Sequence, residues 1–309
     1  MITSFGLVFA LVPAVRRVAL WSGFVDRPSQ RKIHASPIPL LGGAAIYAGC
    51  LGTILAFEGI SPLTLTVAIG GTLLVATGLV DDWYKSRGKD FAVWPRLIIY
   101  LIAATVPLWF GIRIIGVTDV QHRGMIFFPE WLVWLGTIVW VFAITNMINF
   151  IDGVDGLAAG IATLSALTLF VAALLKGENG TALLAVVIVG VCLAFLAYNF
   201  HPAKIFMGDA GATFLGYTLS VIAIDGAFKS ATFVSISVPL LALGVPILDT
   251  AIVFVRRLIE GKGLHRADKL HTHHSLMKWG LTQTQTVSFL YLVGALFCLL
   301  SIIVLLVIS

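Results

Sequence analysis

The 309-residue chain is strongly apolar, because 59% of its residues are hydrophobic and only 11% are charged, giving a mean hydropathy of +1.01. In soluble domains about a quarter of the residues are charged, so this composition excludes a soluble domain and predicts an integral membrane protein. The formal net charge of +5 is explained below by membrane topology and requires no nucleic-acid partner. Cys50, Cys192 and Cys298 lie inside apolar runs without CxxC spacing, which predicts buried thiols and neither disulfides nor a zinc site.

Apolar runs of the length that spans a bilayer recur along the whole chain. They predict an all-α polytopic membrane protein with about ten transmembrane helices in a single domain, residues 1–309. We expect no cleavable signal peptide, since no basic segment or small-residue cleavage site accompanies the first apolar run. The predicted spans are 2–21, 40–57, 63–80, 95–115, 131–148, 157–175, 181–199, 212–228, 233–255 and 285–308.

Ten spans place both termini on one side and divide the loops into two sets. Of the 20 Lys and Arg residues, 16 belong to one set, and only Arg113, Arg123, Lys176 and Lys229 belong to the other. By the positive-inside rule the basic set is cytoplasmic and both termini are extracytoplasmic. The basic loops lie around 22–39, 81–94, 149–156, 200–211 and 256–284.

One outer connector is longer than the others. Between residues 116 and 130, Gly116, Gly124 and Pro129 punctuate a run of Val, Ile and Phe residues. This pattern predicts a small outer hairpin near 116–130.

The segment Asn146–Leu157 places two amides and two carboxylates between apolar runs. On a helix, Asn146, Asn149 and Asp152 would share one face. The two Asp-Gly pairs indicate the end of one helix and the start of the next. The oxygen atoms could hold a hard cation, or the segment could be a well-capped turn, and the segment alone does not separate these readings.

Two adjacent carboxylates, Asp81 and Asp82, close the third predicted span and are followed by Lys85. They repel each other, and at a membrane edge a metal, a basic substrate group or Lys85 must offset their charge. The alternative is an interfacial cap beside a snorkelling lysine.

A third polar segment, Asn199–Gly211, ends in a Gly-Asp-x-Gly turn at Asp209, where the eighth predicted span begins. The start of a helix has free backbone N–H groups and a positive dipole end, which suit a phosphate with its cation. The alternative is that Asp209 is only the helix cap.

The long inner loop 256–284 contains His271, His273 and His274 after Arg266. Imidazoles beside Arg and Lys suit the binding or protonation of phosphate oxygens, whereas the ligands of a closed zinc site are missing. The alternative is a basic loop attracted to anionic lipid.

All these polar segments lie on the predicted cytoplasmic side, whereas unrelated caps would be scattered over both faces. Carboxylates and amides suit Mg²⁺, with Mn²⁺ possible, and Arg, Lys and His suit phosphates. A metal and phosphate site at a lipid boundary indicates phosphoryl transfer onto a lipid carrier.

These residues match the motifs of one known family. The chain resembles the polyprenyl-phosphate N-acetylhexosamine-1-phosphate transferases, among them the enzymes that start bacterial wall teichoic acid and O-antigen synthesis and the translocase that makes lipid I. The resemblance spans nearly the whole chain, and the motifs around Asn149 and Asp209 are highly specific. The matching residues are Asp81-Asp82, Asn146-x-x-Asn149-x-x-Asp152-Gly-x-Asp155-Gly156-Leu157, Asn199-x-x-Pro202-Ala203-x-x-Phe206-Met207-Gly208-Asp209-x-Gly211, His271-x-His273-His274 and, in the first inner loop, Arg27-Pro28, Arg31-Lys32-x-His34 and Pro37-x-Pro39-x-x-Gly42-Gly43.

The resemblance implies a multi-pass enzyme of the bacterial plasma (inner) membrane with a cytoplasmic active site and Mg²⁺ dependence. It implies transfer of N-acetylhexosamine 1-phosphate from a UDP-sugar to undecaprenyl phosphate, with release of UMP, as the first membrane step of a cell-envelope polysaccharide. The spaced His-x-His-His favours the GlcNAc-using teichoic acid and O-antigen branch, and the lipid I translocase is the alternative within the family. A homodimer would fit the relatives.

Carried over by position, the resemblance also implies a role for each matching residue. Asn149 and Asp209 would be metal ligands, and Asp81 and Asp82 the acceptor-side carboxylates, either of which could deprotonate the acceptor. Lys32 would bind substrate. Asp152, Asp155, Asn199 and Phe206 would line the nucleotide pocket, and Arg266, His271, His273 and His274 would hold the sugar phosphate, the last two as catalytic residues.

The chain departs from the family pattern at two positions. Many members of the teichoic acid and O-antigen branch carry a third acid at the position of Lys85. A function that depends on this acid therefore cannot be carried over to this chain. Ala212 replaces a common Ser.

The alternatives from other classes of protein are a secondary transporter and a non-catalytic lipid-binding scaffold. An ion-coupled secondary transporter would place ionisable groups and broken helices near the bilayer midplane, whereas the acids here lie at span ends. Asp249, after Pro246 in the ninth predicted span, is the exception, and we interpret it as a helix-bend or groove residue. A non-catalytic lipid-binding scaffold would not require paired acids.

Overall fold

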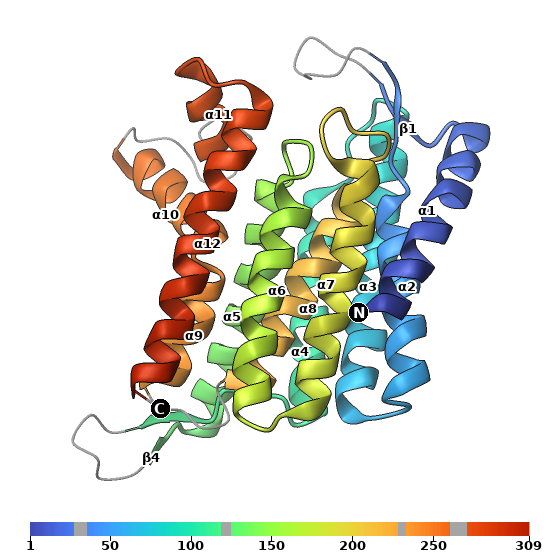
Figure 1. Ribbon diagram of the computed structural model, residues 1–309. Helices are drawn as coiled ribbons and strands as arrows, with labels where there is room; N and C mark the ends of the chain where they lie inside the picture. Colours follow the sequence, from blue (N-terminus) through green and yellow to red (C-terminus); the bar gives the residue numbers. More distant parts are fainter. Residues whose placement is uncertain (28–35, 119–124, 228–232, 260–270, 309) are drawn as a thin grey trace.

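A computed structural model describes residues 1–27, 36–118, 125–227, 233–259 and 271–308 (Figure 1). These residues form helices joined by short connections and two small antiparallel sheets. The helices are α1 (Ile2–Ser22), α2 (Gly42–Phe57), α3 (Pro62–Ser86), α4 (Val93–Trp109), α5 (Glu130–Ile151), α6 (Leu157–Leu175), α7 (Asn179–Asn199), α8 (Gly208–Ala227), α9 (Phe233–Ala242), α10 (Gly244–Ile259), α11 (Thr272–Lys278) and α12 (Gln283–Ile308). The all-α polytopic fold is thereby confirmed.

The two sheets lie at opposite ends of the bundle (Figure 1). At one end, β1 (Val25–Asp26) pairs with β2 (Ile38–Pro39). At the other end, β3 (Gly116–Thr118) pairs with β4 (Met125–Phe127), and Val117 lies opposite Ile126. This second pair is the small hairpin predicted near 116–130.

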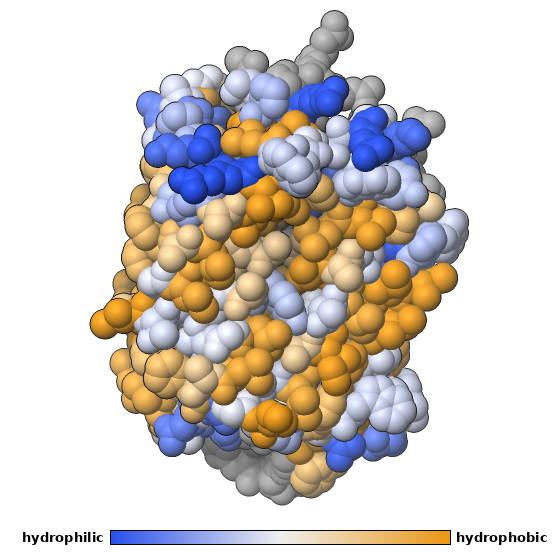
Figure 2. All heavy atoms as spheres, turned by 90° about the vertical axis from the view of Figure 1, so that its right-hand side faces the viewer, coloured by the Kyte–Doolittle hydropathy of each residue, from blue (hydrophilic) through white to orange (hydrophobic). Residues whose placement is uncertain are grey.

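Six helices in the described part of the chain are long and apolar enough to cross a membrane: α1, α3, α5, α6, α7 and α12. The bent pair of residues 236–242 and 244–259 would be a seventh, and α2 and α4 are shorter apolar helices. Figure 2 shows the result as an apolar band between two hydrophilic ends. The total of ten spans and the side of the termini stay predictions.

The predicted ninth span, 233–255, is broken in the structure, because α9 and α10 meet at a bend of 77°. This agrees with the helix bend that Asp249 after Pro246 indicates in the sequence. Pro246 has no backbone N–H, so it cannot donate to the carbonyl of Ala242 one turn earlier. That carbonyl instead accepts a hydrogen bond of 2.6 Å from the hydroxyl of Ser165 on α6. The helix breaks where a neighbouring side chain replaces the lost hydrogen bond.

Helix α8 lies at the centre of the bundle and packs against α2, α3, α5, α6 and α7. Phe214, Leu215 and Tyr217 are fully buried on it. The buried hydroxyls of Thr213 and Thr218 each donate to the carbonyl four residues earlier on the same helix. A central helix of this kind can hold a polar residue at its exposed N-terminus in a fixed position.

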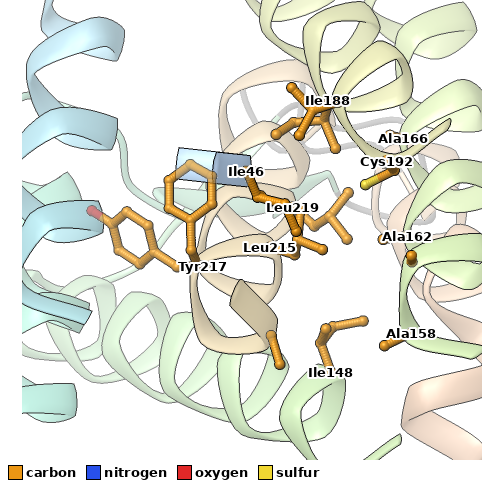
Figure 3. Close-up of a cluster of buried hydrophobic side chains, with 14 of the residues drawn as sticks. Ile46, Ile148, Ala158, Ala162, Ala166, Ile188, Cys192, Leu215, Tyr217 and Leu219 are labelled. Carbon is orange, nitrogen blue, oxygen red and sulfur yellow. The ribbon is translucent and has the colours of Figure 1, made fainter. Parts of the chain in front are cut away.

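Small residues let the neighbouring helices approach α8 closely. Ala158, Ala162 and Ala166 recur once per turn along α6, on the side of Leu215 and Leu219 of α8 (Figure 3). On the α3 side, a Cβ atom on Gly78 would overlap the backbone of Ala210. The end of α3, with its two acids, is thus brought directly against the start of α8.

Candidate active site

A cavity of about 900 Å³ opens at the end of the bundle that carries β1 and α11. Its wall is built from the predicted polar segments, which are far apart in the sequence and are brought together by the fold. The side chains most relevant to chemistry on this wall are Asp26, Asp82, Lys85, Asp152, Asp155, Asn199, His201, Phe206, Asp209, His274 and Lys278. The volume is in the range of small-molecule sites in proteins.

Two acids and two bases form a compact charge network beside the cavity. Lys85 Nζ lies 3.0 Å from Asp81 Oδ2 and 2.8 Å from Asp209 Oδ2. Arg96, in the first turn of α4, lies 2.9 Å from Asp81 and 3.7 Å from Asp209. Since the Asp81 side chain is only 2% exposed, its charge depends on these cations.

Asp82 ties the end of α3 to the start of α8. Its two carboxylate oxygens accept hydrogen bonds from the backbone N–H groups of Asp209, at 3.1 Å, and of Ala210, at 3.3 Å. These N–H groups have no partner inside the helix, and the helix dipole favours a negative charge there. Asp82 therefore caps α8 and positions Asp209.

The loop 152–156 is fastened to the loop that follows α7. Asp155 accepts hydrogen bonds from the backbone N–H of Ala203 at 3.1 Å and pairs with His201 Nδ1 at 2.9 Å. Asn199 accepts from the N–H of Gly156 at 3.0 Å and donates to the carbonyl of Ile205 at 2.9 Å. Asp155 and Asn199, which the resemblance places in the nucleotide pocket, thus brace the cavity wall.

Asp152 follows the last residue of α5 and lies on the cavity wall. Burial raises the pKa of its carboxyl to about 7, with contributions from the charges of Asp209 and Asp155 that Lys85 opposes. A carboxyl group with this pKa can donate as well as accept a hydrogen bond near neutral pH.

Phe206 is placed on the cavity wall by the strand that precedes α2. Its backbone N–H donates to the carbonyl of Pro39, and its carbonyl accepts from Gly42 at 3.0 Å. Gly43 donates to the carbonyl of Met207 at 2.9 Å. A Cβ on Gly42 or Gly43 would overlap this segment, which explains why glycines follow the predicted loop.

The histidine segment is anchored by Asp249 of α10. The carboxylate of Asp249 lies 2.6 Å from His271 Nδ1 and accepts from the backbone N–H of Thr272 at 2.7 Å. His273 is buried beside Gly153, and burial lowers the pKa of its imidazole to about 3, with His274 and His271 adding to the effect and Asp249 opposing it. His274, whose ring centroid lies 4.3 Å from that of His273, reaches the cavity wall.

The structure therefore brings most of the predicted site residues together. Asp82, Asp152, Asp155, Asn199, Phe206, Asp209 and His274 line the cavity, and Asp81, His271 and His273 lie directly behind its wall. Asn149 is half-buried near the end of α5 and is not among the described residues of the wall. Lys32 and Arg266 lie outside the described residues.

A hard divalent cation fits the chemistry of this donor set. Two carboxylate oxygens, from Asp81 and Asp209, already converge on the ammonium group of Lys85, and oxygen is the ligand atom that Mg²⁺ prefers. In the described part of the chain no three His, Cys, Asp or Glu side chains are grouped as a metal centre. A magnesium ion held by Asp209 stays a prediction from the resemblance.

Several residues of the site are given no site role by the sequence, among them Arg96, Asp249 and His201. Arg96 was counted only as a positive-inside residue, and Asp249 only as a helix-bend or groove residue. His201 lies inside a matched motif but at one of its variable positions. The lone acid in an apolar run was the signal that could have revealed Asp249.

Comparison with known proteins finds relatives over most of the chain. Residues 64–227 match the family described as glycosyl transferase family 4. A probable undecaprenyl-phosphate N-acetylglucosaminyl 1-phosphate transferase of Bacillus subtilis is 37% identical over 98% of this chain and 83% of its own length.

Two more distant relatives cover nearly as much of the chain. The decaprenyl-phosphate N-acetylglucosaminephosphotransferase of Mycolicibacterium smegmatis is 32% identical over 90% of the chain and 74% of its own length. The undecaprenyl-phosphate alpha-N-acetylglucosaminyl 1-phosphate transferase of Escherichia coli K12 is 30% identical over 91% and 76%. With a matched segment that runs from α3 to α8, and these relatives over most of its length, the chain belongs to glycosyl transferase family 4.

Proposed function

We propose that the protein transfers N-acetylglucosamine 1-phosphate from UDP-GlcNAc to undecaprenyl phosphate, releasing UMP. The observation that carries this proposal is Asp209 at the N-terminus of α8, held by Asp82, Lys85 and Arg96 beside a cavity of about 900 Å³. The names of the relatives support the sugar phosphate and the polyprenyl acceptor.

The cavity offers the two kinds of group that a nucleotide-sugar requires. Phe206 provides an aromatic surface for the uracil ring, and Asp152 can hydrogen-bond the nucleoside. Lys85, His274 and Lys278 provide positive charge or hydrogen-bond donors for the pyrophosphate and the sugar. The donor would thus lie across the cavity, with its pyrophosphate near the start of α8.

Asp209 would hold a magnesium ion, and Asn149 at the end of α5 is its predicted second protein ligand. Bound there, Mg²⁺ would neutralise the pyrophosphate oxygens that otherwise repel an incoming phosphate. Lys85 and Arg96 pair with both Asp81 and Asp209, and their positive charge offsets the repulsion between these two acids.

In the reaction, an oxygen of the lipid phosphate attacks the phosphorus that carries the sugar, and the bond from this phosphorus to UMP breaks. Transfer between phosphates requires little more than alignment and charge neutralisation. Since the second pKa of a phosphate monoester is about 6, the acceptor is mostly dianionic at neutral pH. Proton removal by Asp81 or Asp82 therefore contributes little, and these acids act mainly through the network that holds Asp209.

The protein would act in the bacterial plasma (inner) membrane with this cavity on the cytoplasmic side, as the basic loops predict. Its product would be the lipid-linked sugar that begins a cell-envelope polysaccharide. A homodimer is a further expectation from the relatives.

Radioactive UMP exchange into UDP-GlcNAc, catalysed by the purified protein with undecaprenyl phosphate and Mg²⁺, tests the proposal. Wild type should exchange label, and exchange should require both Mg²⁺ and the lipid. A protein that forms no labelled UDP-GlcNAc would refute the proposal. Labelled sugar phosphate trapped on the protein without lipid would instead replace the one-step route with a covalent intermediate.

The transporter alternative is not favoured by the broken span. Although α9 and α10 are bent, Asp249 beyond the break binds His271 and Thr272. This acid is therefore occupied in positioning the histidine segment.

A further inference from the structure

Tyr291 of α12 reaches the loop that carries Asp152 and Asp155. Its hydroxyl donates a hydrogen bond of 2.6 Å to the carbonyl of Gly156. The same residue is also held through its preceding peptide group, because the N–H of Gly156 donates to Asn199 of α7 at 3.0 Å. Helices α7 and α12, which are far apart in the sequence, thus both hydrogen-bond to Gly156.

Two glycines make this contact possible. Gly156 has a φ of 79°, a conformation that side chains disfavour. A Cβ on Gly160, one turn into α6, would overlap the ring of Tyr291. The missing side chain at Gly160 therefore provides the space in which the tyrosine lies, and Figure 1 shows α12 beside α6.

Gly156 is the last residue of the loop 152–156, and the loop residues before it face the cavity. Asp152, Gly153, Val154 and Asp155 all line the wall, and Gly156 follows them at the start of α6. The N-terminal part of this loop follows α5 directly. Fixing Gly156 therefore fixes the other end of a short loop whose carboxyl groups face the cavity.

Tyr291 also joins this loop to the histidine segment. Helix α11 ends at Lys278 and α12 begins at Gln283, so His274 and Tyr291 belong to one short stretch of chain. Helix α11 packs against α12. A displacement of α12 at Tyr291 would therefore change how the histidine segment packs against the loop 152–156, where His273 lies beside Gly153.

We propose that Tyr291 is a positioning residue for the UDP-sugar, which acts by clamping Gly156 between α12 and α7. The proposal rests on the function proposed above. It assigns a role in donor binding to the last helix, which lies outside the segment, residues 64–227, that matches the family.

The test compares Tyr291→Phe with the matched variant Tyr217→Phe. Tyr217 is fully buried, whereas Tyr291 is partly buried. In both residues the hydroxyl donates to a backbone carbonyl, which for Tyr217 is that of Thr66 at 3.1 Å, and the ring fills the space over a glycine, which for Tyr217 is Gly70. The hydrogen-bond partner of Tyr217 lies near the start of α3, at the opposite end of that helix from Asp82. The two variants therefore remove the same kind of hydrogen bond near the cavity and far from it.

Steady-state kinetics should show that Tyr291→Phe raises the KM for UDP-GlcNAc about threefold to tenfold, with the KM for undecaprenyl phosphate unchanged. Calorimetric titration with UMP should show the same loss of affinity. Tyr217→Phe should change neither quantity. Equal effects of the two variants, or equal changes in the KM for both substrates, would overturn the proposal.

Hydrogen–deuterium exchange of the unliganded proteins tests the clamp independently of activity. Peptides that contain residues 152–157 should exchange faster in Tyr291→Phe and at the wild-type rate in Tyr217→Phe. An unchanged rate in Tyr291→Phe would overturn the clamp whatever the kinetics. Absence of UMP exchange in wild type together with faster deuterium uptake in Tyr291→Phe would overturn the proposed function and the donor role, and would leave only the contact with Gly156.

Discussion

The two ends of the bundle hold their charged residues in different ways. At the cavity, Lys85 and Arg96 join Asp81 on α3 to Asp209 on α8, and the side chains of these acids are 2% and 16% exposed. At the opposite end, Arg113 pairs with Glu130 at 3.2 Å, and these side chains are 44% and 67% exposed.

The difference concerns what keeps each charge in place. Water and salt screen the pair at the hairpin end, so that such a pair contributes about 0–1 kcal/mol. The network at the cavity is partly shielded from water, and its geometry is fixed by the packing of α3, α4 and α8. Only the network at the cavity holds its charges at defined positions, where they could interact with a substrate.

The largest expected effect is that of Asp209→Asn, which removes one carboxylate from the centre of the network. We expect kcat/KM to fall by at least about 100-fold, because a fixed charge at the reacting phosphates is lost. Glu130→Gln is the control, and it should retain wild-type activity. The exchange assay measures both variants. Undiminished exchange in Asp209→Asn would show that the fixed charges at the cavity end matter no more for activity than the exposed pair at the hairpin end.

Gly78→Val should have the next largest effect, because the new side chain would overlap the backbone of Ala210. The end of α3 would then move away from α8, and a displacement of about 1 Å at an active site can cost about 100-fold in rate. Gly136→Val on α5 is the matched control, since nothing lies within 4 Å of a Cβ added there.

Both glycine variants are compared by exchange rate and by thermal unfolding. If Gly78→Val does not fold, the smaller Gly78→Ala provides the same comparison. Wild-type activity in folded Gly78→Ala would show that the close approach of α3 and α8 does not position the acids.

Arg96→Gln should lower kcat/KM about tenfold or more, because hydrogen bonds to charged groups contribute about 1.5–3 kcal/mol. Lys85 remains to neutralise Asp81 in this variant, so the loss should be smaller than that of Asp209→Asn. Arg113→Gln is the control at the hairpin end and should leave the exchange rate unchanged. Equal activities of the two variants would mean that Arg96 is only a surface cation.

The sequence was sufficient to predict the apolar helices, the outer hairpin and the end of the bundle at which the polar segments gather, but not the β1–β2 pair or α11. Apolar runs predicted most of the spans. Asp81, Asp209 and the histidines were predicted as site residues because they are polar and interrupt these runs. Asp249 after Pro246 indicated a bend in this span, but the sequence could not predict its angle or the contact with Ser165, which is far away in the sequence and replaces a hydrogen bond that Pro246 cannot make.

Local periodicity also fails where a helix ends. On a continuous helix Asn146, Asn149 and Asp152 would share one face, but α5 ends at Ile151 and Asp152 has a ψ of 47°. Asp152 therefore lies on the cavity wall, whereas Asn146 donates to the carbonyl of Phe142 on its own helix. Arg96 and Asp249 could not be assigned because their partners are on other helices.

His201→Ala should have the smallest effect at the cavity end. Its imidazole pairs with Asp155 at 2.9 Å, but it is 42% exposed, and the N–H of Ala203 still binds the same carboxylate oxygen in its absence. We expect kcat/KM for UDP-GlcNAc to fall about twofold to fivefold, as for a largely solvated pair. Asp155→Asn should cost more, because it weakens both hydrogen bonds that hold the loop. If kcat/KM fell as far in His201→Ala as in Asp209→Asn, His201 would have to contact the substrate itself. The exposure of a charged side chain would then not be enough to tell whether it takes part in catalysis.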